Sequence, residues 1–164
     1  MTKFKTFAAM LLAVSCLSMT AAHAQTQPQT QEQIVQNYDQ TQKNKQMVMK
    51  AYQALFGDHD LGALDVYWSD QYIQHNPQMA DGKQGVRDFM TQLGILNSPK
   101  QQVTCLRVIA ENDLVMLQTR SPAFGESPEM VFVDIFRVEN DKIVEHWDVI
   151  QAVPADKTNP RQMY

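Results

Sequence analysis

Residues 131–149 read VFVDIFRVENDKIVEHWDV, and this stretch decides the fold. It contains most of two runs rich in β-branched and aromatic residues, 130–138 and 143–153, with a polar turn between them. Such runs on either side of Asn-Asp-Lys are typical of a β-hairpin. Apolar residues stand at adjacent as well as alternate positions, so both faces of the predicted sheet need cover.

Two further strands are predicted before the hairpin. Residues 102–110 and 114–120 are joined by the polar turn 111–113, and a loop with proline and glycine follows at 121–128. Consecutive strands with short connections predict an antiparallel meander.

The first half of the chain is mainly helical in pattern. Apolar residues recur at helical spacing over 46–57 and 86–93, and Asp60 can cap a short helix at 61–67. A brief strand at 72–74 ends at the sequence His-Asn-Pro. Helices followed by strands predict the α+β class, with three helices against a strongly bent, mainly antiparallel sheet.

The N-terminus has the pattern of a secretory signal peptide over residues 1–24. An early pair of lysines precedes the apolar run 7–14, which is too short to span a membrane, and Ala-His-Ala at 22–24 is a cleavage pattern. We therefore predict a periplasmic or secreted protein. Lipoprotein anchoring at Cys16 is the less favoured alternative, because the leucine usual three residues upstream is missing.

Composition and charge indicate where the domain begins and which classes of partner are unsuited to the chain. Polar residues fill 25–44, which predicts a solvated tether that becomes helical only late, before a domain at 45–154 and a tail at 155–164. Without the leader, 12 basic residues face 18 acidic ones, a net charge of −6. This balance argues against nucleic acid, and no second apolar stretch is long enough to span a membrane. Only Cys105 would remain, so no internal disulfide is expected.

Three stretches of the sequence resemble the nuclear transport factor 2-like superfamily. They are KAYQALFGDHDLGAL at 50–64, YIQHNP and DGKQGVRDFM within 72–90, and the hairpin at 131–149. Within the superfamily, the chain is most similar to the SnoaL-like group of polyketide cyclases and aldol-condensation-type enzymes. The resemblance implies a cone-shaped α+β fold, in which the bent sheet and three N-terminal helices enclose a pocket. Isomerases, dehydratases, epoxide hydrolases and binding proteins share this fold, so it fixes no activity.

Ketosteroid isomerases of the same superfamily imply three site positions. Their pocket tyrosine matches Tyr52, and their oxyanion-hole aspartate matches Asp134 in Val-Asp-Ile-Phe-Arg. Their general base precedes the proline after the first short strand, where this chain has His-Asn-Pro, and we assign this role to His75. The cyclases instead carry an acid–base aspartate on the closing strand. If that position falls at Gln151, the base is absent, because an amide takes no proton at neutral pH.

The residues themselves bear on these assignments. An imidazole titrates near neutral pH, so His75 can exchange protons without tuning. Asp134 stands among apolar neighbours, so its carboxyl must be hydrogen-bonded, paired or neutral, and a neutral carboxyl can donate to an enolate oxygen. Strand alternation sends Arg137 to the opposite face. Structural alternatives remain open: His75 bonded to its own turn, Tyr52 as a core residue, and Asp134 bonded to His146, Trp147 or Arg137.

Other side chains of the hairpin are predicted to contact the ligand: Phe132, Phe136, Trp147, His146 and Asp148. The three aromatic residues among them could instead form a dimer face. The sequence does not decide whether the His146 side or the Trp147 side of the last strand lines the pocket. A two-residue turn places Trp147 opposite Asp134, and a bulged turn shifts that pairing. His146 and Asp148 could hold a metal only with a third ligand, and none is evident. We expect neither a metal nor another cofactor, since no phosphate loop or nucleophile motif is present.

Two functional hypotheses follow. In the first, a cofactor-free exported enzyme uses His75 to remove a proton next to a carbonyl, while Asp134 and Tyr52 stabilise the enolate oxygen. Isomerisation, dehydration and aldol steps share this intermediate. In the second, a non-catalytic periplasmic module holds a small apolar ligand in the same cone. In both, the uncovered apolar face of the sheet predicts a homodimer packed through its outer face.

Overall fold

The computed structural model of the protein describes residues 28–123, 127–156 and 158–164. The predicted signal peptide and Cys16 lie outside these residues. The elements follow in the order α1 (Gln31–Tyr52), η1 (Gln53–Gly57), α2 (Ala63–Tyr67), β1 (Trp68–Gln74), α3 (Gly82–Gln92), η2 (Ile95–Asn97), β2 (Thr104–Glu111), β3 (Leu114–Ser121), β4 (Met130–Glu139) and β5 (Lys142–Ala152).

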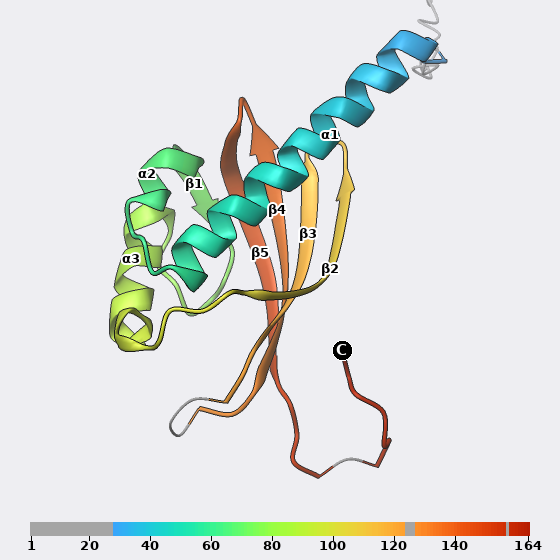
Figure 1. The fold of residues 1–164 in the computed structure, drawn as a ribbon. Coiled ribbons are helices and arrows are strands. Elements are labelled where there is room, and N and C mark those ends of the chain that lie inside the picture. Colours follow the sequence, from blue (N-terminus) through green and yellow to red (C-terminus); the bar gives the residue numbers. More distant parts are fainter. Residues whose placement is uncertain (1–27, 124–126, 157) are drawn as a thin grey trace, which may run out of the picture.

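The five strands form one sheet in the order β1-β5-β4-β3-β2. Strands β2 to β5 pair antiparallel through short connections, and β1 joins the edge parallel to β5. The sheet curls without closing, and α1 crosses one of its faces (Figure 1). Both the α+β class and the bent, mainly antiparallel sheet with helices against it are therefore confirmed.

Helix α1 begins earlier than the sequence analysis predicted. It starts at Gln31, within the expected tether at 25–44, because Thr30 and Gln33 form a capping box that satisfies two free backbone N–H groups. All side chains over 31–40 are exposed, and this part of α1 projects beyond the sheet (Figure 1). The expected tether is therefore exposed but helical over 31–40, whereas Thr41 and Asn44 further along it are buried.

The core lies between α1 and the sheet. The side of the sheet turned toward α1, called the inner face below, carries buried side chains: Val115, Leu117, Asp134 and Phe136. The opposite side, the outer face, carries half-buried or exposed apolar ones: Ile73, Ile109, Ile135, Trp147 and Val149. The expectation that both faces of the sheet are apolar is confirmed.

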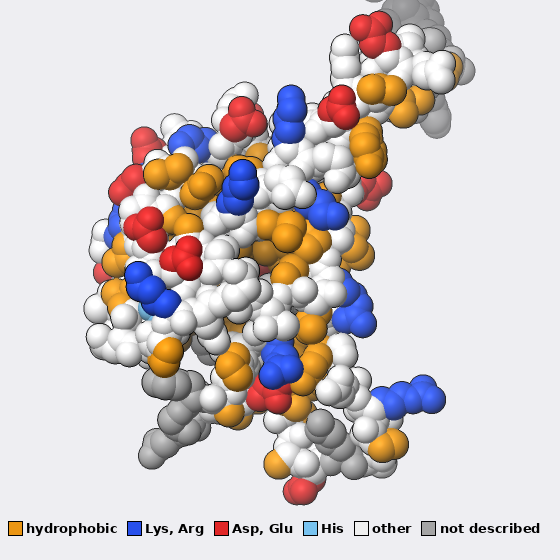
Figure 2. All heavy atoms as spheres, in the orientation of Figure 1, with side chains coloured by type: hydrophobic (Ala, Val, Ile, Leu, Met, Phe, Trp, Pro, Cys, Tyr) orange, Lys and Arg blue, Asp and Glu red, His pale blue; other side chains and the backbone are white. Residues whose placement is uncertain are grey.

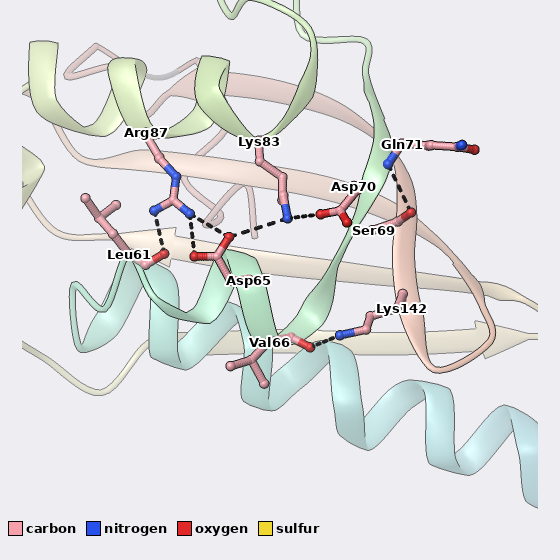
Figure 3. Close-up of polar contacts among 9 residues, drawn as sticks. All are labelled: Leu61, Asp65, Val66, Ser69, Asp70, Gln71, Lys83, Arg87 and Lys142. Atoms are coloured by element: carbon pink, nitrogen blue, oxygen red, sulfur yellow. Dashed lines mark hydrogen bonds and ion pairs between the residues drawn. The ribbon is translucent and has the colours of Figure 1, made fainter.

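Polar contacts fasten α3 to the neighbouring elements (Figure 3). Arg87 of α3 donates two hydrogen bonds to the carboxylate of Asp65 in α2 and one to the carbonyl of Leu61. Lys83 of α3 pairs with Asp70 of β1. Exposed ion pairs contribute little free energy, so these contacts mainly fix how α2 and α3 lie against β1.

Charged side chains of both signs are mixed on one face of the molecule (Figure 2). Lys and Arg side chains are scattered among Asp and Glu on the face shown in Figure 2, without the basic stripe that binds nucleic acid. Within the described residues, no helix combines the length and the apolar character that crossing a membrane requires.

Candidate active site

A bulge in β5 decides which side chains face Asp134. The two turn residues at 140–141 both have positive φ, 51° and 57°, as a tight hairpin turn requires. Val144 then bulges out of the β4–β5 pairing and shifts the register by one residue. Without the bulge, the register of the turn would place Trp147 opposite Asp134; with it, Asp148 lies there. The inner face therefore carries His146 and Asp148.

The structure brings Tyr52 and Asp134 together. Asp134 is only 4% exposed, and its Oδ2 accepts a hydrogen bond from the Tyr52 hydroxyl at 3.1 Å. The same hydroxyl lies 3.0 Å from Thr119 Oγ1 on β3. Helix α1 thus ends with its tyrosine directed onto the centre of the inner face.

His146 is the direct partner of Asp134. Its Nε2 lies 3.0 Å from Asp134 Oδ1, and its Nδ1 lies 3.0 Å from Gln74 Oε1 on β1. The ring is 5% exposed and stacks on Phe136, with ring centroids 4.6 Å apart. The sequence analysis considered this pairing as a structural alternative and placed His146 among the ligand contacts.

The segment after β1 adds residues that the sequence analysis missed. Asn76 is buried, and its side chain donates to Asp148 Oδ2 at 2.7 Å. Gln74 donates to the Tyr72 hydroxyl at 2.9 Å. Alternation along β1 and into the turn after it places Tyr72, Gln74 and Asn76 on one side. Their spacing of two residues is the sequence pattern that could have identified them.

His75 does not join this site. Its side chain is 41% exposed on the outer face, where Nε2 lies 2.8 Å from Glu145 Oε1 and the ring stacks on Trp147. The prediction that His75, Tyr52 and Asp134 share one cavity is therefore wrong for His75, because neighbouring residues of an extended chain point to opposite sides. Trp147 likewise lies on the outer face, stacked on His75, so of the two sides of the last strand that the sequence left open, the His146 side faces Asp134.

The other residues that the sequence singled out are divided between the two faces. Phe136 packs edge-on against Tyr52, and Phe132 is half-buried on the inner face. Arg137 lies on the outer face and pairs with Glu145, as alternation predicted. The hydrogen bonds from His75 and Arg137 hold the pKa of Glu145 below its usual value. Gln151 is exposed and lies opposite Val131.

Burial sets the electrostatics of the inner face. Desolvation raises the pKa of Asp134, against the opposing effect of its bonds to His146 and Tyr52. Desolvation also raises the pKa of Tyr52 well above its usual value, and that of Tyr72. Both tyrosines are therefore neutral, Tyr52 donates to Asp134 and Tyr72 accepts from Gln74, and the carboxyl of Asp134 is biased toward its neutral acid form.

Among the described residues, Asp134, His146 and Asp148 form a group that could hold a metal. Each offers one ligand atom, and these atoms lie within 4.8 Å of one another. Asp134 thus supplies the third ligand that the sequence analysis did not find. Its oxygen, however, contacts His146 Nε2 directly, so a cation would have to separate the two.

The polar side chains at the centre of the inner face are enclosed. Tyr52, Asp134 and His146 are each less than one-tenth exposed. Two surface hollows of about 460 and 500 Å³ lie along α1, and the residues that line them do not include these three. A ligand reaches Asp134 only if neighbouring side chains move.

The chain belongs to the SnoaL-like domain family, whose model matches residues 49–146, more than half of its length. The match includes Tyr52, Asp134 and His146. A comparison with curated proteins finds no match.

Solved structures with the same fold include proteins named for several activities. A candidate polyketide cyclase from Acidithiobacillus ferrooxidans is 16% identical, with a TM-score of 0.53 over 66% of this chain and 87% of that one. An LEH-like epoxide hydrolase from M. tuberculosis is 16% identical, with a TM-score of 0.52 over 68% and 85%. A candidate ketosteroid isomerase from Kribbella flavida is 12% identical, with a TM-score of 0.55 over 76% and 89%. Likeness at this identity shows the fold alone.

Proposed function

We propose that the protein is a cofactor-free exported enzyme that performs acid–base chemistry on a small apolar carbonyl compound. The observation that carries the proposal is the buried contact of Asp134 with Tyr52 and His146. Isomerisation, dehydration and aldol steps all pass through an enolate. We propose that the protein catalyses the formation of this enolate. The half-buried Phe132 and the buried Phe136 provide apolar contact for the ligand.

Two carboxyl groups in different surroundings supply the acid and the base. Asp134 is buried and biased toward the neutral acid, and its two oxygens contact Tyr52 and His146. When a ligand enters, the Tyr52 hydroxyl turns from Asp134 to donate to the developing enolate oxygen, beside an uncharged Asp134. Asp148 lies opposite it on β5, is half-buried, and is oriented by Asn76. We assign proton removal to Asp148, because paired carboxyls with unlike surroundings commonly divide the two roles.

Enolisation can be measured without knowing the substrate. In D₂O, an enolising enzyme exchanges the hydrogen next to the carbonyl of a ketone, which proton NMR detects. We expect exchange above the buffer rate with simple cyclic ketones, and loss of exchange in Asp148→Asn. Asp88→Asn, at an exposed position on α3, is the matched control. Binding of these ketones without exchange would instead establish the second hypothesis, a binding module, which the enclosure of Asp134 favours.

A phenol series tests the oxyanion role of Asp134. The variant Asp134→Asn keeps a donor of similar shape, so neutral ligands should bind as before. Phenolate-like ligands, which mimic an enolate, should bind more weakly, because an amide N–H is a weaker donor than a carboxylic acid. The loss should not exceed about 1.5–3 kcal/mol, the value of a hydrogen bond to a charged group. Fluorescence titration checks this. Unchanged phenolate affinity, with an Asp134 pKa below 3.8 by NMR, would refute the oxyanion role.

Assembly and location complete the proposal. Two copies pack through the outer face, whose apolar side chains include Ile135 and Val149. Export rests on the sequence pattern of residues 1–24. Detection of a chain in the periplasm that begins near Gln25 would support it, and a full-length cytoplasmic chain would contradict it.

A further inference from the structure

The side-chain amide of Gln74 has only one possible orientation. Its Oε1 lies 2.9 Å from the backbone nitrogen of Asn76, and its Nε2 lies 2.9 Å from the Tyr72 hydroxyl. A backbone N–H can only donate, so the amide oxygen must face Asn76. Turning the amide over would set two donors against each other inside the protein.

This orientation fixes the hydrogens on the His146 ring. The Gln74 oxygen that accepts from Asn76 also lies 3.0 Å from His146 Nδ1. An oxygen acceptor at that distance requires Nδ1 to carry a hydrogen. In the neutral ring the other nitrogen, Nε2, is then a bare acceptor.

A bare Nε2 cannot lie against a carboxylate. Nε2 is 3.0 Å from Asp134 Oδ1, a hydrogen-bond distance, so one proton must lie between the two atoms. It resides either on Asp134, giving a neutral pair, or on His146, giving a buried ion pair. Both side chains are about 95% buried, and burial of two charges is the costlier arrangement.

We infer that Gln74 is a positioning residue: it holds His146 in the neutral Nδ1–H form and thereby keeps one proton on Asp134, in the hydrogen bond to His146 Nε2. The catalytic meaning of this inference rests on the proposed function. An uncharged pair adds no negative charge beside a developing enolate, whereas an ionised Asp134 would repel it.

The main chain explains why Gln74 can do this. In the parallel pairing of β1 with β5, Gln74 lies directly beside His146. Asn76, in the turn that follows, makes two of the contacts. Its backbone N–H orients Gln74, and the side chain of Asn76 holds Asp148. One segment thus sets the position of the proton on Asp134 and the orientation of the second carboxylate.

The wild-type protein gives the first test. Long-range ¹H–¹⁵N NMR distinguishes protonated from bare ring nitrogens, and Asp134→Asn identifies the His146 signals. At neutral pH we expect Nδ1 protonated and Nε2 bare. A bare Nδ1, or two protonated nitrogens, would overturn the inference.

Variants at position 74 give the second test. Gln74→Glu keeps the acceptor and adds a negative charge, so the proton should move from Asp134 to His146 and Nε2 should become protonated. Gln74→Met removes the acceptor and should deplete the Nδ1–H form. Gln71→Glu adds the same charge at an exposed position of β1 and should leave the ring unchanged. A His146 spectrum that is the same in both Gln74 variants as in wild type would refute the role of Gln74.

The outcome is separable from that of the proposed function. The expected ring spectrum without ketone exchange would leave the role of Gln74 standing and reject the enzyme. Ketone exchange together with a bare Nδ1 on His146 would support the enzyme and reject the role of Gln74.

Discussion

At the scale of residues, the inner face shows how the chain tolerates a buried acid. Asp134 has lost nearly all contact with water, and Tyr52 and His146 occupy its two oxygens. A carboxyl so placed is satisfied as a neutral acid without a buried charge. The amide of an asparagine can make the same contacts, because it also offers one donor and one acceptor.

A pH-dependent stability follows from the raised pKa of Asp134. The folded state holds the proton above the ordinary value of 3.8, whereas the unfolded state releases it. Stability contributed by Asp134 is therefore complete at acidic pH and falls as pH rises, by at most about 1.4 kcal/mol per pH unit. We expect urea unfolding from about pH 4 to about pH 7 to show wild type losing stability relative to Asp134→Asn.

The comparison with Asp134→Asn cancels the groups that act in the opposite direction. Asp65, Asp70 and Glu145 have pKa values lowered by their basic partners, and they stabilise the fold as pH rises in both proteins. If wild type lost no stability relative to the variant over this range, Asp134 would be an ionised, paired carboxylate, because such a group gains its stability below about pH 4.

The sequence predicted that Tyr52 and Asp134 lie together, as they do in the structure, but it did not predict that His75 lies on the other face. Asp134 can be recognised in the sequence as a polar residue in an apolar strand. Which side of the sheet His75 faces depends instead on where β1 begins. Observed alternation puts Asn76 with Tyr72 and Gln74, and His75 outward. The strand predicted from the sequence covers only 72–74, which is too short for the alternation of side chains to show which residues face inward.

At the scale of elements, order and approximate bounds could be predicted, but register could not. The predicted helices and strands are present, because helical and alternating patterns are local properties. The bulge at Val144 cannot be predicted from local sequence, because it depends on how β4 and β5 pack. It places Asp148 rather than Trp147 opposite Asp134. The early start of α1 was missed because its first turns bury no apolar surface.

The connection from β1 to α3 makes a further prediction at this scale. Gly85 is buried, and a Cβ placed on it would lie 1.8 Å from the carbonyl oxygen of Ala80. Gly85→Ala must therefore move the backbone between Asn76 and α3, and we expect a loss of about 1–3 kcal/mol in urea unfolding. Gly62→Ala is the control, since its new methyl group meets only the side chain of Asp60. Equal stabilities for the two variants would show that the turn is not tightly packed.

At the scale of the whole molecule, the two faces of the sheet have different roles. The inner face carries the enclosed polar site under α1, and the outer face carries apolar side chains beside His75 and Arg137. Val149 is the most exposed large apolar residue of the described chain, at 69%. Neighbouring exposed apolar side chains are typical of protein interfaces.

A homodimer through the outer face predicts what a charge at Val149 does. Two-fold symmetry brings the same patch of each copy together, so Val149→Glu buries two carboxylates in one interface. We expect light scattering to show a dimer for wild type and at least a tenfold weaker dimer for the variant, about 1.4 kcal/mol. Val66→Glu on α2 is the matched control, because Val66 is 58% exposed away from the outer face. A wild-type monomer at high micromolar concentration would contradict the interface, as would equal weakening by both substitutions.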